Sequence, residues 1–281
     1  MTAAGAAEPL RRQPLEAKAS RVRLSRFLLP AYAWLVIAYT IVPIAVMIVY
    51  SFNQSASSRV TFAWQGFTTT WYSQVFALSD LTNALEHSVE IAVGSTLISL
   101  LLGVPLALGL ARHRFRGRAA VDSVIFIDIA APSVVVGAAL LSLFITLNVP
   151  LGLGTILIAH VAFNVAYVTI VVRARAVGLD PAIEKAAADL GASPWTAFRT
   201  VTLPLLLPGI IAGALLAFAM SIDDFIITQF VAGPRLTFPL YVYGAVKTGI
   251  PPQVFVMGTM IFAVGVLIAV ANTIFQRRTQ L

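Results

Sequence analysis

The segment Glu184–Pro204 reads EKAAADLGASPWTAFRTVTLP and lies between two long apolar stretches. Most connections between helices need only a few residues, but this segment belongs to a polar stretch that covers residues 173–203. Its alanines favour a first helix, Gly191 can end that helix, and Ser193-Pro194 is typical of the start of a second one. A connection of this length, with its own signals for two helices, indicates a surface that binds another protein.

The composition is that of an integral membrane protein. Of the 281 residues, 59% are hydrophobic and 11% are charged, whereas about a quarter of the residues in a soluble domain are charged. The runs Phe27–Tyr50 and Val254–Phe275 contain no charged residue, and about 20 apolar residues are enough to cross a bilayer as a helix. The first run is longer than the core of a signal peptide, so we expect it to be retained as a span.

The apolar runs predict an all-α protein with six transmembrane helices. We place these spans at residues 27–50, 88–111, 120–147, 153–172, 204–230 and 254–275. The outer loop 51–87 between the first two spans is rich in aromatic residues, which predicts a short helix along the membrane surface. The sequence contains no cysteine, so disulfides and thiolate metal sites are excluded.

The distribution of positive charge predicts the orientation in the membrane. When residues 1–26, 112–119, 173–203 and 276–281 are placed on one side, that side holds 16 of the 19 Lys and Arg residues. Positive residues accumulate in cytoplasmic segments. We therefore expect a cytoplasmic tail (1–26), a six-helix transmembrane domain (27–275) that includes the cytoplasmic loop 173–203, and a second cytoplasmic tail (276–281). The net charge of +7 is then explained without a nucleic-acid partner.

Acidic residues inside the predicted spans are candidates for a substrate pathway. Ionisable groups within a membrane are costly and usually face a protein or water-filled interior. Asp223 and Asp224 are neighbours, and on a helix they would point 100° apart, so one could line a pathway while the other makes a structural contact. A pair at the outer end of a span that reaches lipid headgroups is the simpler alternative. Asp128 lies four residues before Pro132, whose ring frees a backbone carbonyl.

Polar residues on the fourth predicted span share one helical face. His160, Asn164 and Tyr167 follow one another at i, i+4 and i+7, a spacing that suits either hydrogen bonds between helices or the lining of a passage. The three histidines fall in different segments, so no zinc site is indicated. No paired nucleophile and base supports an intramembrane hydrolase, and no phosphate-binding loop of the Gly-x4-Gly-Lys-Ser/Thr type is present.

The long loop resembles one in the permease subunits of ATP-binding-cassette importers. Those subunits carry Glu-Ala-Ala-x3-Gly-x9-Ile-x-Leu-Pro between two late spans. The matching residues, with every spacing kept, are Lys185-Ala186-Ala187, Gly191, Val201 and Leu203-Pro204. Lysine stands where the pattern has glutamate, and valine stands where it has isoleucine. The resemblance implies a type I ABC importer permease (MetI-like) fold.

In that family the loop forms two short helices, and the second sits in a groove of the ATPase subunit. Trp195 and Phe198 lie three residues apart, so they would form an apolar knob on one face of this helix. An amphipathic helix resting on the bilayer is the alternative. The resemblance assigns ATPase coupling to Lys185, Ala186, Ala187, Gly191, Trp195, Phe198, Leu203 and Pro204.

Other segments resemble the spermidine/putrescine importers within this class. They are Tyr50-Ser51-Phe52-Asn53 after Pro43, Trp64-x-Gly66-Phe67-x3-Trp71-Tyr72, Ser221-Ile222-Asp223-Asp224-Phe225, Phe230-x2-Gly233 and Thr237-Phe238-Pro239-Leu240. The resemblance implies a polyamine permease of the bacterial plasma membrane, working by alternating access. A polycation needs negative charge in a low-dielectric passage. The pathway residues that we expect are Asp223, Asp224, Asp128, Asn164 and Tyr167.

The resemblance also implies the partners and the source of energy. The protein partners are a second permease subunit, two ATP-binding cassette ATPase subunits and an extracytoplasmic substrate-binding protein. Membrane lipid surrounds the permease subunits. No enzyme activity and no cofactor are expected in this chain, since ATP and Mg would be bound by the ATPases. Alternatives are an importer of the same class for thiamine, ferric iron or an aminophosphonate, and a cation-coupled secondary transporter that uses the same aspartates.

Overall fold

The computed structural model describes residues 16–55 and 63–279, which are almost entirely helical. Within these ranges the one departure towards β-structure is an isolated bridge between Asn53 and Phe67. The helices in chain order are α1 (Glu16–Tyr50), α2 (Thr70–Ser73), α3 (Ser79–Arg112), α4 (Arg118–Ala130), α5 (Ser133–Thr146), α6 (Leu153–Val177), α7 (Pro181–Asp189), α8 (Pro194–Ala197), the π-helical turn η1 (Phe198–Thr202), α9 (Leu203–Ile222), α10 (Ile226–Val231), α11 (Phe238–Thr248) and α12 (Pro252–Thr279).

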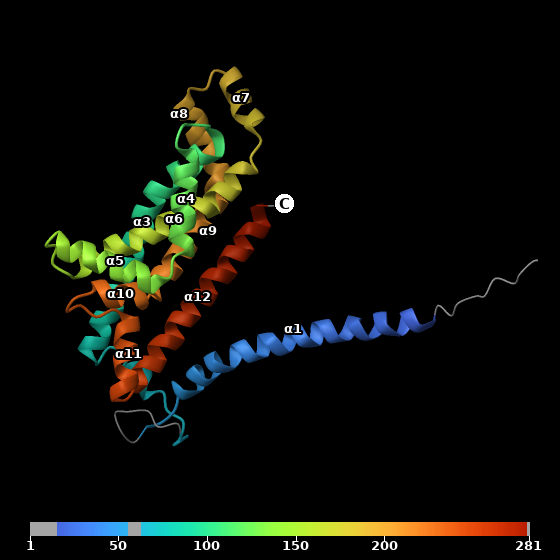
Figure 1. Cartoon of the computed structure of the whole chain (residues 1–281). Coiled ribbons are helices and arrows are strands. Elements are labelled where there is room, and N and C mark those ends of the chain that lie inside the picture. Colours follow the sequence, from blue (N-terminus) through green and yellow to red (C-terminus); the bar gives the residue numbers. More distant parts are fainter. Residues whose placement is uncertain (1–15, 56–62, 280–281) are drawn as a thin grey trace, which may run out of the picture.

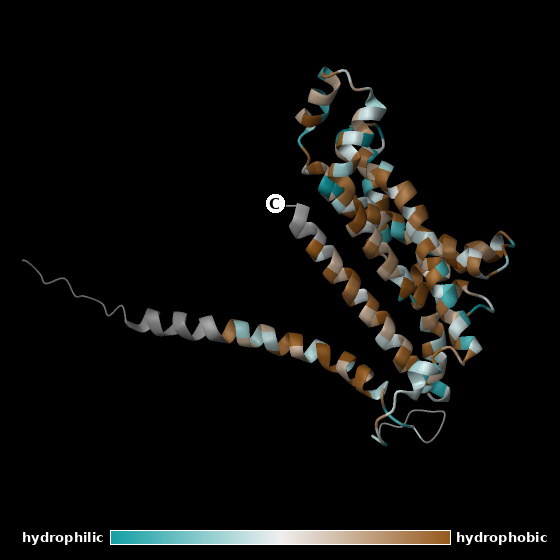
Figure 2. Cartoon of the chain, turned by 180° about the vertical axis from the view of Figure 1, so that it is seen from behind, coloured by the Kyte–Doolittle hydropathy of each residue, from teal (hydrophilic) through white to brown (hydrophobic). Residues whose placement is uncertain are grey.

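Five of the six predicted spans correspond to a helix that is long and apolar enough to cross a membrane. These helices are α1, α3, α6, the continuous stretch α8–η1–α9, and α12. Several run beyond the predicted limits, because α3 begins at Ser79 and α6 continues to Val177. Figure 2 shows hydrophobic residues along most of α12 and of the coloured part of α1, as expected for surfaces that contact lipid or another membrane subunit.

The third predicted span, 120–147, is wrong as a continuous helix. It is divided into α4 and α5, which meet at an angle of 109°. The backbone of Ala131 is extended, with ψ 134°, because the ring of Pro132 disfavours the helical conformation in the residue before it. Pro132 also lacks an N–H group, so it cannot continue the ladder of helical hydrogen bonds. The pair is a sixth span only if it is counted as a broken one.

The fifth predicted span, 204–230, is also interrupted. Helix α9 ends at Ile222, residues 223–225 are not helical, and the short helix α10 follows. The expectation that the adjacent aspartates lie on one helix is therefore wrong. They occupy the break between two helices.

The central core is formed by α3, α6 and α9, which make the most extensive contacts between helices. Glycines allow close approach: a Cβ atom added to Gly103 would lie 2.7 Å from Val168 of α6, and one added to Gly209 would lie 2.7 Å from Cβ of Arg175. By contrast, α1 runs away from the other helices and meets α12 near its end (Figure 1). The membrane-spanning part of α1 has no buried residue.

The predicted outer surface helix is α2, and both of its aromatic side chains face the protein. Trp71 donates from Nε1 to the carbonyl of Asn53 at 2.9 Å, and the hydroxyl of Tyr72 lies 2.7 Å from Oγ of Ser51. Both rings pack on a cluster that contains Met257 of α12. This segment is therefore anchored to the helical bundle through specific contacts.

Candidate functional site

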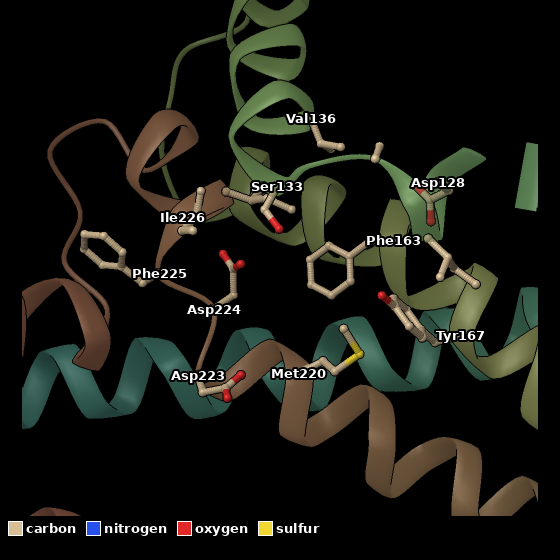
Figure 3. A pocket seen from close by; sticks show the side chains of 13 residues that line it. Asp128, Ser133, Val136, Phe163, Tyr167, Met220, Asp223, Asp224, Phe225 and Ile226 are labelled. Atoms are coloured by element: carbon tan, nitrogen blue, oxygen red, sulfur yellow. The ribbon is translucent and has the colours of Figure 1, made fainter. Parts of the chain in front are cut away.

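A cavity of about 560 Å³ lies where α4, α5, α6, α9 and α10 meet. Three of its lining residues are the aspartates that the sequence analysis singled out: Asp128 at the end of α4, and Asp223 and Asp224 in the break after α9. No Lys, Arg or His is among the side chains that line it. Figure 3 shows the carboxylates of Asp128 and Asp224 entering the cavity from different elements, with aromatic rings nearby.

The carboxylate of Asp224 is held in place by α10. Its Oδ2 atom accepts hydrogen bonds from the backbone N–H and the hydroxyl of Thr228, each at 2.8 Å. These bonds satisfy one of the backbone donors that the start of a helix leaves free. Nε2 of His160 lies 3.5 Å from the same oxygen. The side chain of Asp224 is 13% exposed, so its position is fixed while part of it still reaches the cavity.

A series of buried hydrogen bonds connects α3 to Asp224. Oγ of Ser95 on α3 donates to Oγ of Ser221 at 3.0 Å. Oγ of Ser221 lies 2.6 Å from Nδ1 of His160, and Nε2 of His160 lies 2.9 Å from the hydroxyl of Thr228. The hydroxyl of Thr228 then donates to Asp224.

The donors in this series of hydrogen bonds can all point towards Asp224. Since Thr228 gives its proton to Asp224, it accepts from Nε2–H of His160; since Ser221 accepts from Ser95, it gives its own proton to Nδ1. A neutral imidazole with its proton on Nε2 satisfies every partner. The series connects α3, α6 and α9 to the carboxylate.

Asp128 differs from Asp224 because one of its oxygens is buried without a hydrogen-bond partner. Its Oδ2 atom is buried and makes no hydrogen bond. Buried carboxylate oxygens are normally paired, because an unpaired polar group is costly away from water. Asp128 therefore lines the cavity with one of its carboxylate oxygens unsatisfied.

The other predicted pathway residues are placed at different depths. Asp223 is exposed and ends α9, and Tyr167 is half-buried and lines the cavity. Asn164 is fully buried and is not among the lining residues. Its Nδ2 atom donates weakly to Ser95 at 3.5 Å. Asn164 therefore lies beside the series of hydrogen bonds and does not reach the cavity.

At the far end of the molecule, α7 and α8 project beyond the bundle (Figure 1). The side chain of Asp180 caps α7, and Oγ of Ser193 accepts the N–H of Thr196 to cap α8, with proline at the first helical position in both cases. Gly191 has φ +85°. Such a left-handed residue at the end of a helix favours glycine.

The fixed spacing between alanine and glycine in the loop has a structural explanation. The N–H of Ala192 donates to the carbonyl of Ala187, and the N–H of Gly191 donates to the carbonyl of Ala188. This pair of bonds is the Schellman motif, which ends a helix with a glycine just beyond it. Ala186 and Lys185 lie on the same helix, with Lys185 exposed, whereas Leu203 and Pro204 begin α9.

Trp195 and Phe198 form the aromatic knob that the sequence predicted. Their rings stack with centroids 5.6 Å apart, and Trp195 is 68% exposed. A large aromatic side chain exposed at the tip of a structured loop is typical of an interaction site.

Glu184 ties this loop to the bundle. Its carboxylate accepts hydrogen bonds from Arg112, the last residue of α3, and from the hydroxyl of Thr202, just before α9. The hydrogen bond from Arg112 lowers the pKa of Glu184 below its ordinary value, against a smaller opposing effect of burial, and Thr202 adds to the lowering. Glu184 precedes the lysine that replaces the glutamate of the loop pattern, and in this chain it contacts α3.

Comparison with known proteins identifies the family. The model of the family described as "Binding-protein-dependent transport system inner membrane component" matches residues 99–281. The chain belongs to this family. As a binding-protein-dependent transport system component, it is a permease subunit and a multi-pass protein of the bacterial inner membrane.

Two relatives within this family are similar over most of their length. The "Spermidine/putrescine transport system permease protein PotC" of Escherichia coli (strain K12) is 36% identical over 255 residues, which are 90% of this chain and 96% of the relative. The "Putrescine transport system permease protein PotI" of the same strain is 38% identical over 234 residues, which are 80% of this chain and 82% of the relative.

Solved structures confirm the type I ABC importer permease (MetI-like) fold for this family member. A bacterial ABC transporter involved in the import of the acidic polysaccharide alginate aligns with a TM-score of 0.63 at 20% identity, covering 91% of this chain and 97% of that one. The MetNI methionine transporter aligns with a TM-score of 0.59 at 15% identity, covering 71% of this chain and 96% of that one.

The sequence does not indicate a role for several residues that build the site in this permease subunit. Ser95, Ser221 and Thr228 are small polar residues in apolar helices, and nothing in their spacing marks them. Their common signal is only that each is a hydroxyl within a span, where hydrogen bonds between helices are the usual role.

Proposed function

We propose that the chain is the permease subunit of an ATP-driven importer that moves polyamines such as spermidine and putrescine inward across the bacterial inner membrane. The observation that carries this proposal is the cavity with three carboxylates and no basic residue among its lining side chains. Charges in a membrane interior require compensation, so such a cavity favours a molecule with several positive charges. The names of the relatives PotC and PotI point to the same class of substrate.

Asp128 and Asp224 have different roles in this proposal. The carboxylate of Asp128, which lines the cavity, accepts a hydrogen bond from a substrate ammonium group. Asp224 supplies a fixed negative charge, because Thr228 holds its carboxylate. Tyr167 and Phe163 line the cavity between them, and aromatic faces attract alkylammonium groups.

The energy enters through partner subunits. We propose that this chain pairs with a second permease subunit, that both receive substrate from an extracytoplasmic binding protein, and that two ATPase subunits bind ATP and Mg on the cytoplasmic side. In this arrangement both termini and the loop 173–203 are cytoplasmic, which agrees with the positive charge of these segments. The knob of Trp195 and Phe198 inserts into an ATPase subunit.

Helix α9 links this docking site to the cavity. It begins at Leu203, directly after η1, and ends beside Asp223. At 1.5 Å per residue its 20 residues span about 30 Å. Movement of α8 when the ATPases close is therefore transmitted along one helix to the carboxylates, and the cavity opens alternately to the two sides of the membrane.

The test is uptake by the complete importer, reconstituted in liposomes with its binding protein. Spermidine or putrescine should be taken up and should stimulate ATP hydrolysis, whereas thiamine, ferric iron and an aminophosphonate should not. Asp128→Asn and an Asp223→Asn, Asp224→Asn double variant should each lose uptake by about tenfold or more, since hydrogen bonds to charged groups contribute about 1.5–3 kcal/mol. Glu86→Gln, which removes an exposed carboxylate of α3 outside the cavity, is the matched control.

Two outcomes would overturn the proposal. Stimulation by another solute and none by polyamines would assign a different substrate. Uptake by this chain alone, without ATPase subunits, would indicate a cation-coupled secondary transporter.

A further inference from the structure

A second groove lies on the other side of the break between α9 and α10. Its volume is about 450 Å³, and its walls come from the end of α9, from α11 and from α12. Most of the lining is apolar, but Asp223 is shared with the carboxylate cavity, as is Phe225. Figure 3 shows the ring of Phe225 directed away from Asp128 and Tyr167. The break therefore separates two neighbouring spaces and contributes to both.

Two aromatic side chains of this groove lie in contact with each other. The ring centroids of Phe225 and of Tyr243 on α11 lie 4.7 Å apart, at an interplanar angle of 44°. Phe238 also lines the groove. The groove thus combines three aromatic rings with one carboxylate and contains no other charged residue in its lining. Aromatic faces beside a carboxylate are the surroundings that recognise alkylammonium groups.

One ring of this groove already holds a cation of the chain itself. Nζ of Lys247 lies over the ring of Tyr243, 4.4 Å from its centroid. Within residues 16–55 and 63–279, no ion pair involves Lys247. The side chain of lysine ends in a butylammonium group, which has the chemistry of one end of a linear polyamine.

We propose that Asp223, Phe225 and Tyr243 form a second ammonium subsite, separate from the cavity of Asp128 and Asp224, and that Lys247 occupies its aromatic wall in the absence of substrate. This inference rests on the proposed function and extends it. A linear polyamine places one ammonium group in each space, with its methylene chain beside the break. Lys247 competes for the ring of Tyr243 and leaves it when the substrate enters.

Uptake kinetics of the reconstituted importer, with putrescine as the substrate, test this subsite. Tyr243→Leu removes the aromatic face and should raise KM about 2- to 5-fold, as expected for a partly exposed cation–π contact. Tyr243→Phe keeps a ring and should raise KM less. Lys247→Met removes the competitor and should lower KM about 2- to 5-fold. In the double variant with Tyr243→Leu, Lys247→Met should have no further effect, because the two residues act through one contact.

Arg235→Met is the matched control for the loss of a positive charge. Arg235 lies between α10 and α11, and no ring contact or ion pair involves its side chain within the described residues. An equal fall in KM for Arg235→Met and Lys247→Met would mean that the loss of any positive charge causes the effect, and it would overturn the proposal. An unchanged KM for Lys247→Met would do the same, and this exposed residue can be replaced even if Tyr243→Leu does not assemble.

The same measurements separate this subsite from the proposed function. If the unmodified importer takes up no polyamine, the proposed function fails. If it takes up putrescine and depends on Asp128, but Tyr243→Leu and Lys247→Met leave KM unchanged, only the second subsite fails.

Discussion

Nδ1 of His160 lies 2.6 Å from Oγ of Ser221, although 61 residues separate them in the sequence. The contact joins the first half of α6 to the last turn of α9, two residues before Asp223. The other ring nitrogen contacts Thr228, which holds the carboxylate of Asp224. One buried imidazole therefore connects the core of the protein to the acidic wall of the cavity.

Replacement of His160 by leucine should weaken both stability and substrate affinity. It removes one hydrogen-bond partner from each of the buried hydroxyls of Ser221 and Thr228. Each lost hydrogen bond costs about 0.5–1.5 kcal/mol. Thr228 and Asp224 both lose their contact with the imidazole, so the carboxylate is held less firmly and KM for putrescine should rise. Thermal unfolding in detergent and uptake in liposomes measure the two effects. Thr169→Val removes a buried hydroxyl of the same helix outside the series of hydrogen bonds and is the control; equal results for the two variants would contradict this role.

The direction of the series of hydrogen bonds can be measured directly. If the hydrogen bonds run from Ser95 to Asp224, His160 carries its proton on Nε2 and none on Nδ1. The ¹⁵N NMR spectrum of protein with labelled histidine should therefore show this tautomer for His160, with the resonance assigned by its loss in a histidine variant. A proton on Nδ1 would mean that Ser221 accepts from the ring and that the series does not run towards Asp224.

The ion pair of Glu184 and Arg112 should make the stability of the loop dependent on pH. Because folding lowers the pKa of Glu184, the stabilisation is present above the ordinary value of 4.5 and is lost as the pH falls through the lowered pKa. The residues are 29% and 25% exposed, so the gain is less than about 1 kcal/mol.

Unfolding temperatures of the wild-type protein and Glu184→Gln, measured from pH 7 to pH 3, test this ion pair. The two proteins should differ at pH 7 and converge in acid. Asp189→Asn, which replaces an exposed carboxylate of the same helix, should show no such convergence. A constant difference at every pH would exclude the ion pair as its cause.

Alanine in place of Trp195 and Phe198 should uncouple transport from ATP hydrolysis. The rings stack on each other and Trp195 is exposed, so their loss should leave the bundle folded and remove the knob. Stimulation of ATPase activity by substrate in the reconstituted complex should disappear. Trp34→Ala, which removes a tryptophan of similar exposure from α1, should retain it. Unchanged stimulation in the double variant would count against the knob as the docking site.

Two glycines of α9 should respond differently to alanine. A Cβ atom at Gly209 would lie 2.7 Å from Cβ of Arg175, whereas one at Gly213 would meet no atom nearer than 3.6 Å. Overpacking of a close helix contact typically costs about 1–3 kcal/mol. Gly209→Ala should therefore lower the unfolding temperature and Gly213→Ala should not; equal effects would show that α6 and α9 can separate at little cost.

The sequence predicted the elements that depend on local patterns. Apolar length predicted five of the six spans. The positions of Gly191 and Ser193 predicted the end of α7 and the start of α8, because helix caps have specific residue preferences. The kink at Pro132 was indicated, but its size was not, since a proline sets a break and tertiary packing sets the angle.

The interior of the site could not be predicted in the same way. The break at Asp223 contains neither proline nor glycine, and it is held by contacts of Asp224 with Thr228 and His160 that form only in the folded protein. For the same reason the helical spacing of His160 and Asn164 indicated a shared face but could not show that both point into the core. The roles of the aspartates in transport stay predictions.

The break between α9 and α10 makes Asp223 and Asp224 electrostatically different, although they are identical and adjacent. Aligned peptide dipoles place partial negative charge at the end of a helix and partial positive charge at its start. Asp224 accepts the backbone N–H of Thr228 at the start of α10, where this positive end offsets its charge. Asp223 follows the carbonyl end of α9, where the field of the helix adds to its own. A cation near Asp223 is therefore attracted by the backbone as well as by the carboxylate, and part of that attraction persists when the side chain is neutral.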